Sequence, residues 1–170
     1  MRQMADAGHA PNLSNWNMPS FTVRRLSSGD EQALALVARE ETDFTGEESS
    51  PPLAPADARA YLSDPAVWHW HAEADGQPIG FLLAYVHPQR HGEARHVMFD
   101  EIGVREGWRR RGVGRALVDA LHKQMRAEGI QEVWVLADNP EAGAFYEACG
   151  YAVDEVQGVM LSHSVADREA

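Results

Sequence analysis

Residues 109–129 read RRRGVGRALVDALHKQMRAEG, and this stretch decides the fold class. From residue 112 to 128 apolar side chains recur at helical spacing, and Gly129 is a typical helix end. The residues before this helix, 97–104, have the pattern of a strand, and a strongly apolar strand follows at 132–137. A strand, a long amphipathic helix and a second strand in this order predict a pair of parallel strands around the helix.

The patterns on both sides of this unit predict an α/β (α+β) fold, in which a mixed, mostly antiparallel twisted sheet is flanked by about four helices. Asp75-Gly76 is a hairpin turn signal, because both residues tolerate a positive φ. We expect residues 1–20 to be a flexible leader and residues 21–170 to form a single domain. The other expected elements are strands at 21–26, 67–74 and 79–86, helices at 30–41, 55–62 and 141–149, loops at 42–55 and 87–96, and a closing hairpin made of 151–156 and 159–165.

The chain has 170 residues, a size typical of one domain, and its 26 acidic and 15 basic side chains give a formal net charge of −11. This charge argues against a general nucleic-acid-binding protein and favours cationic partners. Acidic residues concentrate at 27–57, where a solvated helix face is the alternative explanation, and arginines concentrate at 105–115. One cysteine, no apolar stretch long enough for a membrane span and no signal-peptide pattern lead us to expect a cytoplasmic protein without a membrane partner.

The start of the long helix has the features of an anion site. Gly112 and Gly114 allow the backbone to turn tightly, so that successive N–H groups point into one small volume at the helix N-terminus. The positive end of the helix dipole and the flanking arginines favour a phosphate there. The stretch is not a Walker loop, because no Lys-Ser or Lys-Thr follows the second glycine, and it lacks the third glycine of the dinucleotide fingerprint. A purely structural helix start is the alternative.

Three motifs in this chain resemble those of the GCN5-related N-acetyltransferase (GNAT) superfamily. Arg109-x-x-Gly112-x-Gly114 is similar to the pyrophosphate loop of that family, and Glu101-Ile102-Gly103-Val104 is similar to the splayed strand before the loop. Residues 139–151, NPEAGAFYEACGY, resemble its C-terminal signature. The resemblance spans residues 21 to about 165 and implies the GNAT fold with a splayed pair of parallel strands.

The resemblance implies acetyl-coenzyme A (acetyl-CoA) as the acetyl donor. The backbone N–H groups of residues 110–115 would hold its pyrophosphate, the edge of strand residues 102–104 would pair with the pantetheine arm, and Asn139 would contact the arm further along. The residues implied in cofactor binding are Ile102, Gly103, Val104, Arg109, Arg110, Arg111, Gly112, Val113, Gly114, Arg115, Asn139 and Tyr146.

The chemistry that the resemblance implies is direct attack of an amine on the thioester, which needs a proton acceptor for the amine and a proton donor for the thiolate. Tyr146 stands where many family members place a tyrosine near the coenzyme sulfur, so it is the candidate general acid. Simple core packing on a short helix is the alternative role for this tyrosine.

Three carboxylates are candidates for binding the acceptor amine. Asp100 and Glu101 come just before an expected bulge, and because adjacent strand residues point to opposite faces, only one of them can face the acceptor. We prefer Glu101, which is also the candidate catalytic base. Asp138 follows the strand at 132–137, and capping or ion pairing is its alternative role.

A narrower resemblance is to the type I aminoglycoside 3-N-acetyltransferases, and it rests on Tyr61 and on residues 84–88, 99–104, 109–112 and 135–138. In that group an Asp stands at the position of Glu101, and the loop after Asp138 is longer than in this chain. Both differences touch the acceptor site, so they concern which amine of the acceptor is acetylated. The implied acceptor is a cationic small-molecule amine, foremost the 3-amino group of an aminoglycoside. The alternatives are another small amine, a polyamine or a protein amine, or an acyl-CoA-binding sensor without turnover; relatives that are dimers imply a homodimer.

Two histidines alternate with two tryptophans on the strand expected at 67–74. His69 and His71 share one face of that strand, and Trp68 and Trp70 share the other. A metal site would need a third ligand, which we cannot place. We therefore expect a packed or exposed histidine pair and no metal.

Overall fold

The computed structural model describes residues 20–90 and 95–154, and the chain divides into two compact units after Val135. The strands of the first unit are β1 (Thr22–Arg25), β2 (Val67–Ala74), β3 (Gln77–Pro88), β4 (Arg95–Val104) and β5 (Glu132–Val135). Its helices are α1 (Glu31–Arg39), α2 (Glu41–Phe44), α3 (Pro55–Ser63), the 3-10 turn η1 (Glu106–Trp108) and α4 (Val113–Ala127). The second unit contains α5 (Pro140–Ala148).

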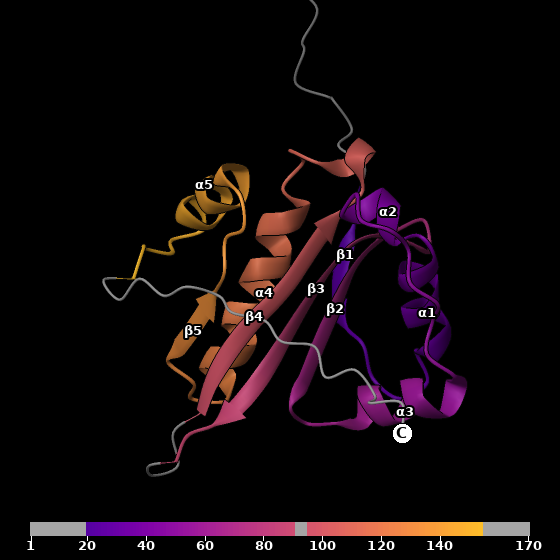
Figure 1. The fold of residues 1–170 in the computed structure, drawn as a ribbon, viewed down its shortest axis with the longest axis horizontal. Helices are drawn as coiled ribbons and strands as arrows, with labels where there is room; N and C mark the ends of the chain where they lie inside the picture. The colour runs from indigo at the N-terminus through magenta and orange to yellow at the C-terminus, as the bar shows by residue number, and fades with distance from the viewer. Residues whose placement is uncertain (1–19, 91–94, 155–170) are drawn as a thin grey trace, which may run out of the picture. The chain divides into compact units, whose positions relative to one another are not determined.

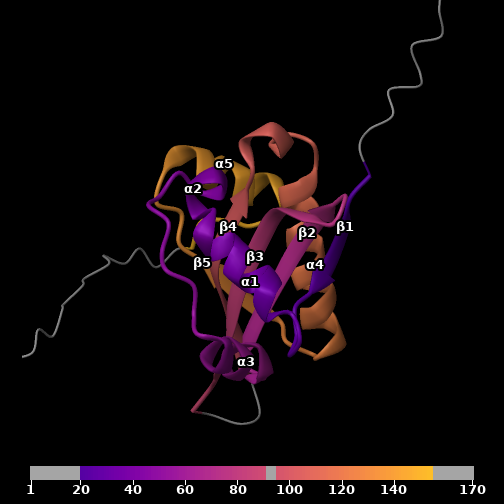
Figure 2. The ribbon, with the colours of Figure 1, turned by 90° about the vertical axis from the view of Figure 1, so that its right-hand side faces the viewer.

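The five strands form one sheet in the order β1-β2-β3-β4-β5. Neighbouring strands from β1 to β4 are antiparallel, whereas β4 and β5 are parallel and are joined through α4. Helices α1 and α3 lie on one side of the sheet and α4 lies on the other (Figures 1 and 2). The expected mixed sheet with one parallel pair around the long helix is confirmed.

The long helix follows its sequence pattern closely. Its apolar stripe is buried against the sheet, as the spacing predicts. Gly112 is its N-cap, and Gly129 closes its other end with a φ of +68°. The buried residues of the stripe are Val113, Leu117, Val118, Leu121 and Met125.

Alternation along β2 places different side chains on the two faces of the sheet. Trp68 and Trp70 are on the face that also carries Gly80, where an added Cβ would meet Val113 of α4. His69 and His71 are on the opposite face, their rings 5.2 Å apart, and both are buried. The structure therefore shows a packed histidine pair.

Some elements differ from the sequence expectations. Helix α2 takes up the start of the segment expected as a loop at 42–55, because Phe44 packs with Val37 and Phe81 in the core. Strand β3 runs to Pro88 and shortens the polar loop expected at 87–96. The described residues hold five α-helices where about four were expected.

Most of the closing hairpin expected at 151–156 and 159–165 lies beyond Asp154, where the described residues end. Residues 151–154 form no strand, and the rest of the segment lies outside the described residues. The expectation of a leader at 1–20 also falls almost entirely outside them, so it stays a prediction, as does the single domain over 21–170.

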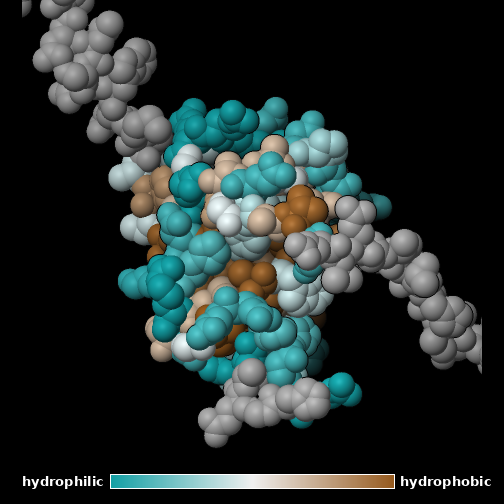
Figure 3. Space-filling model, turned by 90° about the vertical axis from the view of Figure 1, so that its left-hand side faces the viewer, coloured by the Kyte–Doolittle hydropathy of each residue, from teal (hydrophilic) through white to brown (hydrophobic). Residues whose placement is uncertain are grey.

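The face of the molecule shown in Figure 3 is mostly polar. Hydrophilic residues cover most of the face in Figure 3, with smaller hydrophobic areas between them. None of the helices in the described part of the chain has the length and apolar character that a membrane crossing needs.

Candidate active site

The turn before α4 has the backbone geometry that the glycine pattern predicts. Gly112 has a φ of +84° and Arg110 a φ of +61°, so two residues of the turn are left-handed. The Ala116 N–H donates to the Gly112 carbonyl at 3.0 Å, and the N–H groups of Val113 and Gly114 precede this first helical bond. A Cβ at Gly112 would meet nothing within 4 Å. The turn is thus an open backbone cradle at a helix N-terminus, which can hold an anion.

The arginines around this turn do different work. Arg109 donates from Nε to the Val104 carbonyl at 2.9 Å and from a terminal nitrogen to the Phe44 carbonyl at 3.0 Å. Its guanidinium therefore ties the turn to β4 and α2, so it is less available to an anion than the sequence suggests. Arg110 and Arg111 are exposed beside the cradle.

Arg105 ties α2 and its junction with α1 to the sheet. Its guanidinium donates to the Pro78 carbonyl at 2.7 Å, to Asp43 at 2.9 Å and to Glu40, and it lies over the ring of Phe44. Part of the acidic run at 27–57 is thus paired with arginines within the fold.

The last part of β4 has one open edge in the described sheet. β4 pairs with β3 as far as Val104, whereas its pairing with β5 ends at Phe99. Beyond that point residues 100–104 have no partner strand on the β5 side among the described strands. The expected splay is present, and such an edge can accept an extended ligand as an added strand.

A β-bulge was expected just after Glu101, and the structure places it at Asp100. Leu83 of β3 faces Glu101, and the next residue, Ala84, faces Phe99, so Asp100 is the extra residue. Simple alternation would send Asp100 and Glu101 to opposite faces. Because the bulge interrupts that alternation, both carboxylates lie close enough to Tyr61 to raise the pKa of its phenol.

Glu101 is the most perturbed of the candidate carboxylates. Burial raises its pKa to about 7, and repulsion by Glu41, Asp100 and Glu47 adds to the shift. The pKa of Asp100 is also raised by burial. A carboxyl that is partly protonated at neutral pH can accept and release protons there.

Two tyrosines border this carboxylate pair, and the sequence did not reveal their role. Burial raises the pKa values of Tyr61 and Tyr85, and the charges of Asp100 and Glu101 raise both further. The Tyr61 hydroxyl lies 3.2 Å from Nδ1 of His69. Burial, with His71 beside it, lowers the pKa of His69 to about 3, so this ring is neutral at pH 7.

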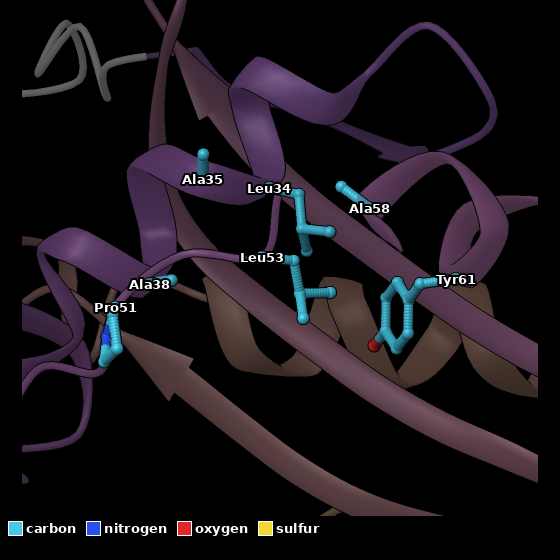
Figure 4. A pocket seen from close by; sticks show the side chains of 7 residues that line it. All are labelled: Leu34, Ala35, Ala38, Pro51, Leu53, Ala58 and Tyr61. Atoms are coloured by element: carbon cyan, nitrogen blue, oxygen red, sulfur yellow. The ribbon is translucent and has the colours of Figure 1, made fainter. Parts of the chain in front are cut away.

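An apolar pocket of about 220 Å³ in the first unit has Tyr61 in its wall (Figure 4). It lies between α1, the segment before α3 and α3 itself. Its lining consists of Leu34, Ala35, Ala38, Pro51, Leu53, Ala58 and Tyr61. The motifs assign neither this pocket nor the acidic neighbours Glu41 and Glu47, and the acidic run at 27–57 is the one sequence signal that includes the two glutamates.

The second unit carries Asp138, Asn139 and Tyr146. Asn139 is the N-cap of α5: its Oδ1 accepts from the Ala142 N–H at 2.8 Å, and its Nδ2 donates to Asp138 at 2.7 Å. Tyr146 is buried, its ring centre 5.8 Å from that of Tyr151. Burial raises the pKa of Tyr146 to about 12, with the charges of Asp138 and Cys149 adding to it. The phenol is therefore protonated at neutral pH.

Comparison with known proteins agrees with this geometry. The profile of the acetyltransferase (GNAT) family matches residues 13–151. A curated relative, the mycothiol acetyltransferase of Streptomyces avermitilis, is 36% identical over 86 residues, which cover 49% of this chain and 27% of that relative.

Solved structures with low sequence identity share the fold. An aminoglycoside acetyltransferase, meta-AAC0020 from an uncultured soil metagenomic sample, has a TM-score of 0.74 at 22% identity, over 86% of this chain and 97% of its own, and 0.72 when in complex with sisomicin. The ribosomal-protein-alanine N-acetyltransferase of Brucella melitensis has a TM-score of 0.65 at 21% identity, over 84% of this chain and 100% of its own. The family match covers the splayed strand and the α4 cradle, and this chain belongs to the acetyltransferase (GNAT) family.

Proposed function

We propose that the chain is an acetyl-CoA-dependent N-acetyltransferase of a cationic small-molecule amine, with the 3-amino group of an aminoglycoside as the leading acceptor. One observation carries the proposal: in the first unit, the segment from Glu101 to Gly112 joins a partly protonated carboxyl, an open strand edge and an anion cradle. These are the parts that such a transfer needs from a protein.

The cradle and the edge fit the donor. Gly112 is left-handed with open space around it, so a pyrophosphate can approach the N–H groups of residues 110–115. The open edge at Ile102, Gly103 and Val104 suits an extended pantetheine arm. Asn139 already caps α5, so we propose that it sets the start of that helix as well as contacting the arm.

Bound acetyl-CoA would supply an acetyl group as a thioester. Glu101 takes the proton that the acceptor ammonium must lose before its nitrogen bonds to the acetyl carbon, and a pKa of about 7 suits this role at neutral pH. A backbone N–H near Val104 polarises the carbonyl oxygen. Tyr146 holds the proton that the thiolate takes as the carbon–sulfur bond breaks.

The acceptor assignment rests on charge and on the relatives. Asp100 and Glu101, with Glu41 and Glu47 near enough to act on Glu101, favour an acceptor with several positive charges. Asp138 is a further proposed acceptor contact. An aminoglycoside acetyltransferase in complex with sisomicin shares the fold, which supports this class of acceptor. The 3-amino position rests on the narrower sequence resemblance alone.

A protein amine is the second candidate acceptor, because a ribosomal-protein-alanine N-acetyltransferase also shares the fold. An acyl-CoA sensor that keeps the cradle without turnover is the remaining alternative.

The test is thiol release from acetyl-CoA by the purified protein with gentamicin, kanamycin, spermidine or a lysine-bearing peptide. Turnover with an aminoglycoside, and a product one acetyl group heavier, would support the leading acceptor, and fragmentation of the product would give the position. Turnover with the peptide alone would replace it by the protein amine. No turnover, with coenzyme still bound, would favour the sensor.

A further inference from the structure

We propose that the acceptor places an apolar part without hydroxyl groups in the pocket between α1 and α3, beside the amine that becomes acetylated. This inference rests on the proposed function and specifies its substrate class. The pocket selects an amine whose charged part meets the carboxylates and whose neighbouring carbon skeleton is free of hydroxyls.

The pocket walls are almost entirely apolar. Among the lining residues that the structure describes, Tyr61 alone carries a polar side-chain atom. In Figure 4 the side chains of Leu34 and Leu53 stand side by side, and the ring of Tyr61 faces them. Leu53 leaves 50% of its surface exposed. At about 220 Å³ the pocket is smaller than the roughly 300–1,000 Å³ that encloses a whole drug-sized ligand, so it receives one part of the acceptor.

The pocket lies on the face of the sheet that carries Glu101. At one end Tyr61 lines the pocket, and its hydroxyl is 3.2 Å from His69, which the strand pairing places in one cross-strand row with Leu83 and Glu101. At the other end Pro51 follows Ser50, whose N–H donates to the Glu41 carboxylate at 3.3 Å, and Glu41 is the charged neighbour that perturbs Glu101 most. An acceptor amine at Glu101 therefore has the apolar walls next to it.

The wall at Tyr61 is held in place. Its hydroxyl is 3.2 Å from the buried His69, and the two rings meet edge to face with centres 6.1 Å apart. A pocket with fixed walls does not adapt to a poorly fitting ligand.

This arrangement penalises a hydroxyl group in the pocket. Such a hydroxyl would lose part of its hydration, and the side chains of the lining offer it a single polar atom, the Tyr61 hydroxyl, which is already engaged with Nδ1 of His69. A buried hydroxyl without a partner weakens binding, whereas a methylene group in the same place strengthens it.

The experiment compares acceptors that differ in hydroxyl groups and not in amines. Dibekacin is kanamycin B without its 3′ and 4′ hydroxyls, and butylamine matches 3-aminopropan-1-ol with a methyl in place of the hydroxyl. In at least one of the two pairs, we expect kcat/KM to be about 10-fold or more higher for the compound without the hydroxyl groups, which is dibekacin or butylamine. The difference should lie mainly in KM, and its size is typical of a small apolar group in a pocket. Equal kcat/KM within both pairs would overturn the proposal.

Two pocket variants and two controls make the comparison specific. Ala38→Leu fills the pocket, and Gln32→Leu adds the same side chain on an exposed position of α1. Leu53→Ser makes the mouth polar without adding volume, and Val153→Ser changes another exposed apolar residue. In the pocket variants, the ratio of the two kcat/KM values within a pair should fall close to 1, and in the controls it should stay as in the wild type. A ratio that is unchanged in both pocket variants would contradict the assignment.

Failure of the proposed function is distinguishable from failure of this inference. If no amine gives thiol release, the enzyme proposal fails, and calorimetric titration with dibekacin and kanamycin B then tests the pocket alone. Tighter binding of dibekacin that Ala38→Leu abolishes and Gln32→Leu preserves would support the pocket. Equal affinity for the two compounds, or no binding of either, would refute it.

Discussion

The carboxyl of Glu101 sets the expected pH dependence of the reaction. Burial and three neighbouring carboxylates raise its pKa to about 7, and a general base works only when ionised. We expect kcat/KM to rise with pH through a midpoint near 7. This midpoint should be absent in Glu101→Gln, whose rate should be lower by about 100-fold or more.

The position of that midpoint should respond to Glu41. Glu41→Gln removes the neighbouring charge with the largest effect on Glu101, so the midpoint of the rate profile should move to lower pH. Glu48→Gln is the matched control, because it removes an exposed acid that is not among the causes of the Glu101 shift. Equal profiles for the two variants would assign the midpoint to another group.

The same raised pKa has a consequence for stability. The folded state holds the Glu101 proton more tightly than the unfolded chain, whose glutamates titrate near about 4.3. The contribution of Glu101 to stability is therefore lost as pH rises from that value through about 7. The Tm of Glu101→Gln minus the Tm of the wild type, measured by thermal unfolding, should be larger at pH 8 than at pH 4. A difference in Tm independent of pH would show that the carboxyl is not perturbed.

Removal of the Tyr146 hydroxyl tests whether this residue takes part in catalysis or only packs in the core. Its pKa of about 12 keeps the phenol protonated, as a proton donor to the thiolate must be. Tyr146→Phe should lower kcat by about 100-fold and leave coenzyme affinity nearly unchanged. Tyr151→Phe removes the hydroxyl of a second, half-buried tyrosine of the same unit and should retain activity. Equal activity of the two variants would show that Tyr146 has a packing role only.

At the scale of the element, the glycines at the two ends of α4 give a matched pair of variants for testing the coenzyme cradle. Gly112 and Gly129 flank this helix, both with a positive φ and both with open space where a Cβ would lie. Alanine at either position should cost a similar strain of about 1–2 kcal/mol. Only Gly112→Ala should weaken coenzyme binding, measured by calorimetric titration, because it distorts the cradle. Loss of affinity in Gly129→Ala as well would indicate a general effect on the helix.

The elements also show what the sequence can and cannot predict. α4 was predictable because five buried apolar side chains repeat at one period over its whole length. α2 was not, because its four residues are held by distant partners: Phe44 packs on Phe81, and Arg105 binds Asp43. A local sequence pattern does not reveal contacts between residues that are far apart in the chain.

The candidate site divides in the same way. Glu101 and the glycines of the cradle were found from motifs, because each lies in one continuous segment. A bulge was expected just after Glu101, but its position at Asp100 required the structure, since one extra residue leaves no mark in an alternating pattern. Tyr61, Tyr85 and His69 come together only when α3, β2 and β3 pack, so their arrangement required the structure.

At the scale of the whole molecule, the net charge of −11 predicts how acceptors respond to salt. Carboxylates that attract a cation over a distance lose that attraction as the screening length falls from about 10 Å at 0.1 M to about 3 Å at 1 M salt. KM for spermidine or an aminoglycoside should therefore rise steeply with sodium chloride concentration, while kcat stays nearly constant. Butylamine, with one charge, is the control and should show a much smaller rise. A KM with the same salt dependence for both would mean that the acidic surface is solvated and takes no part in acceptor capture.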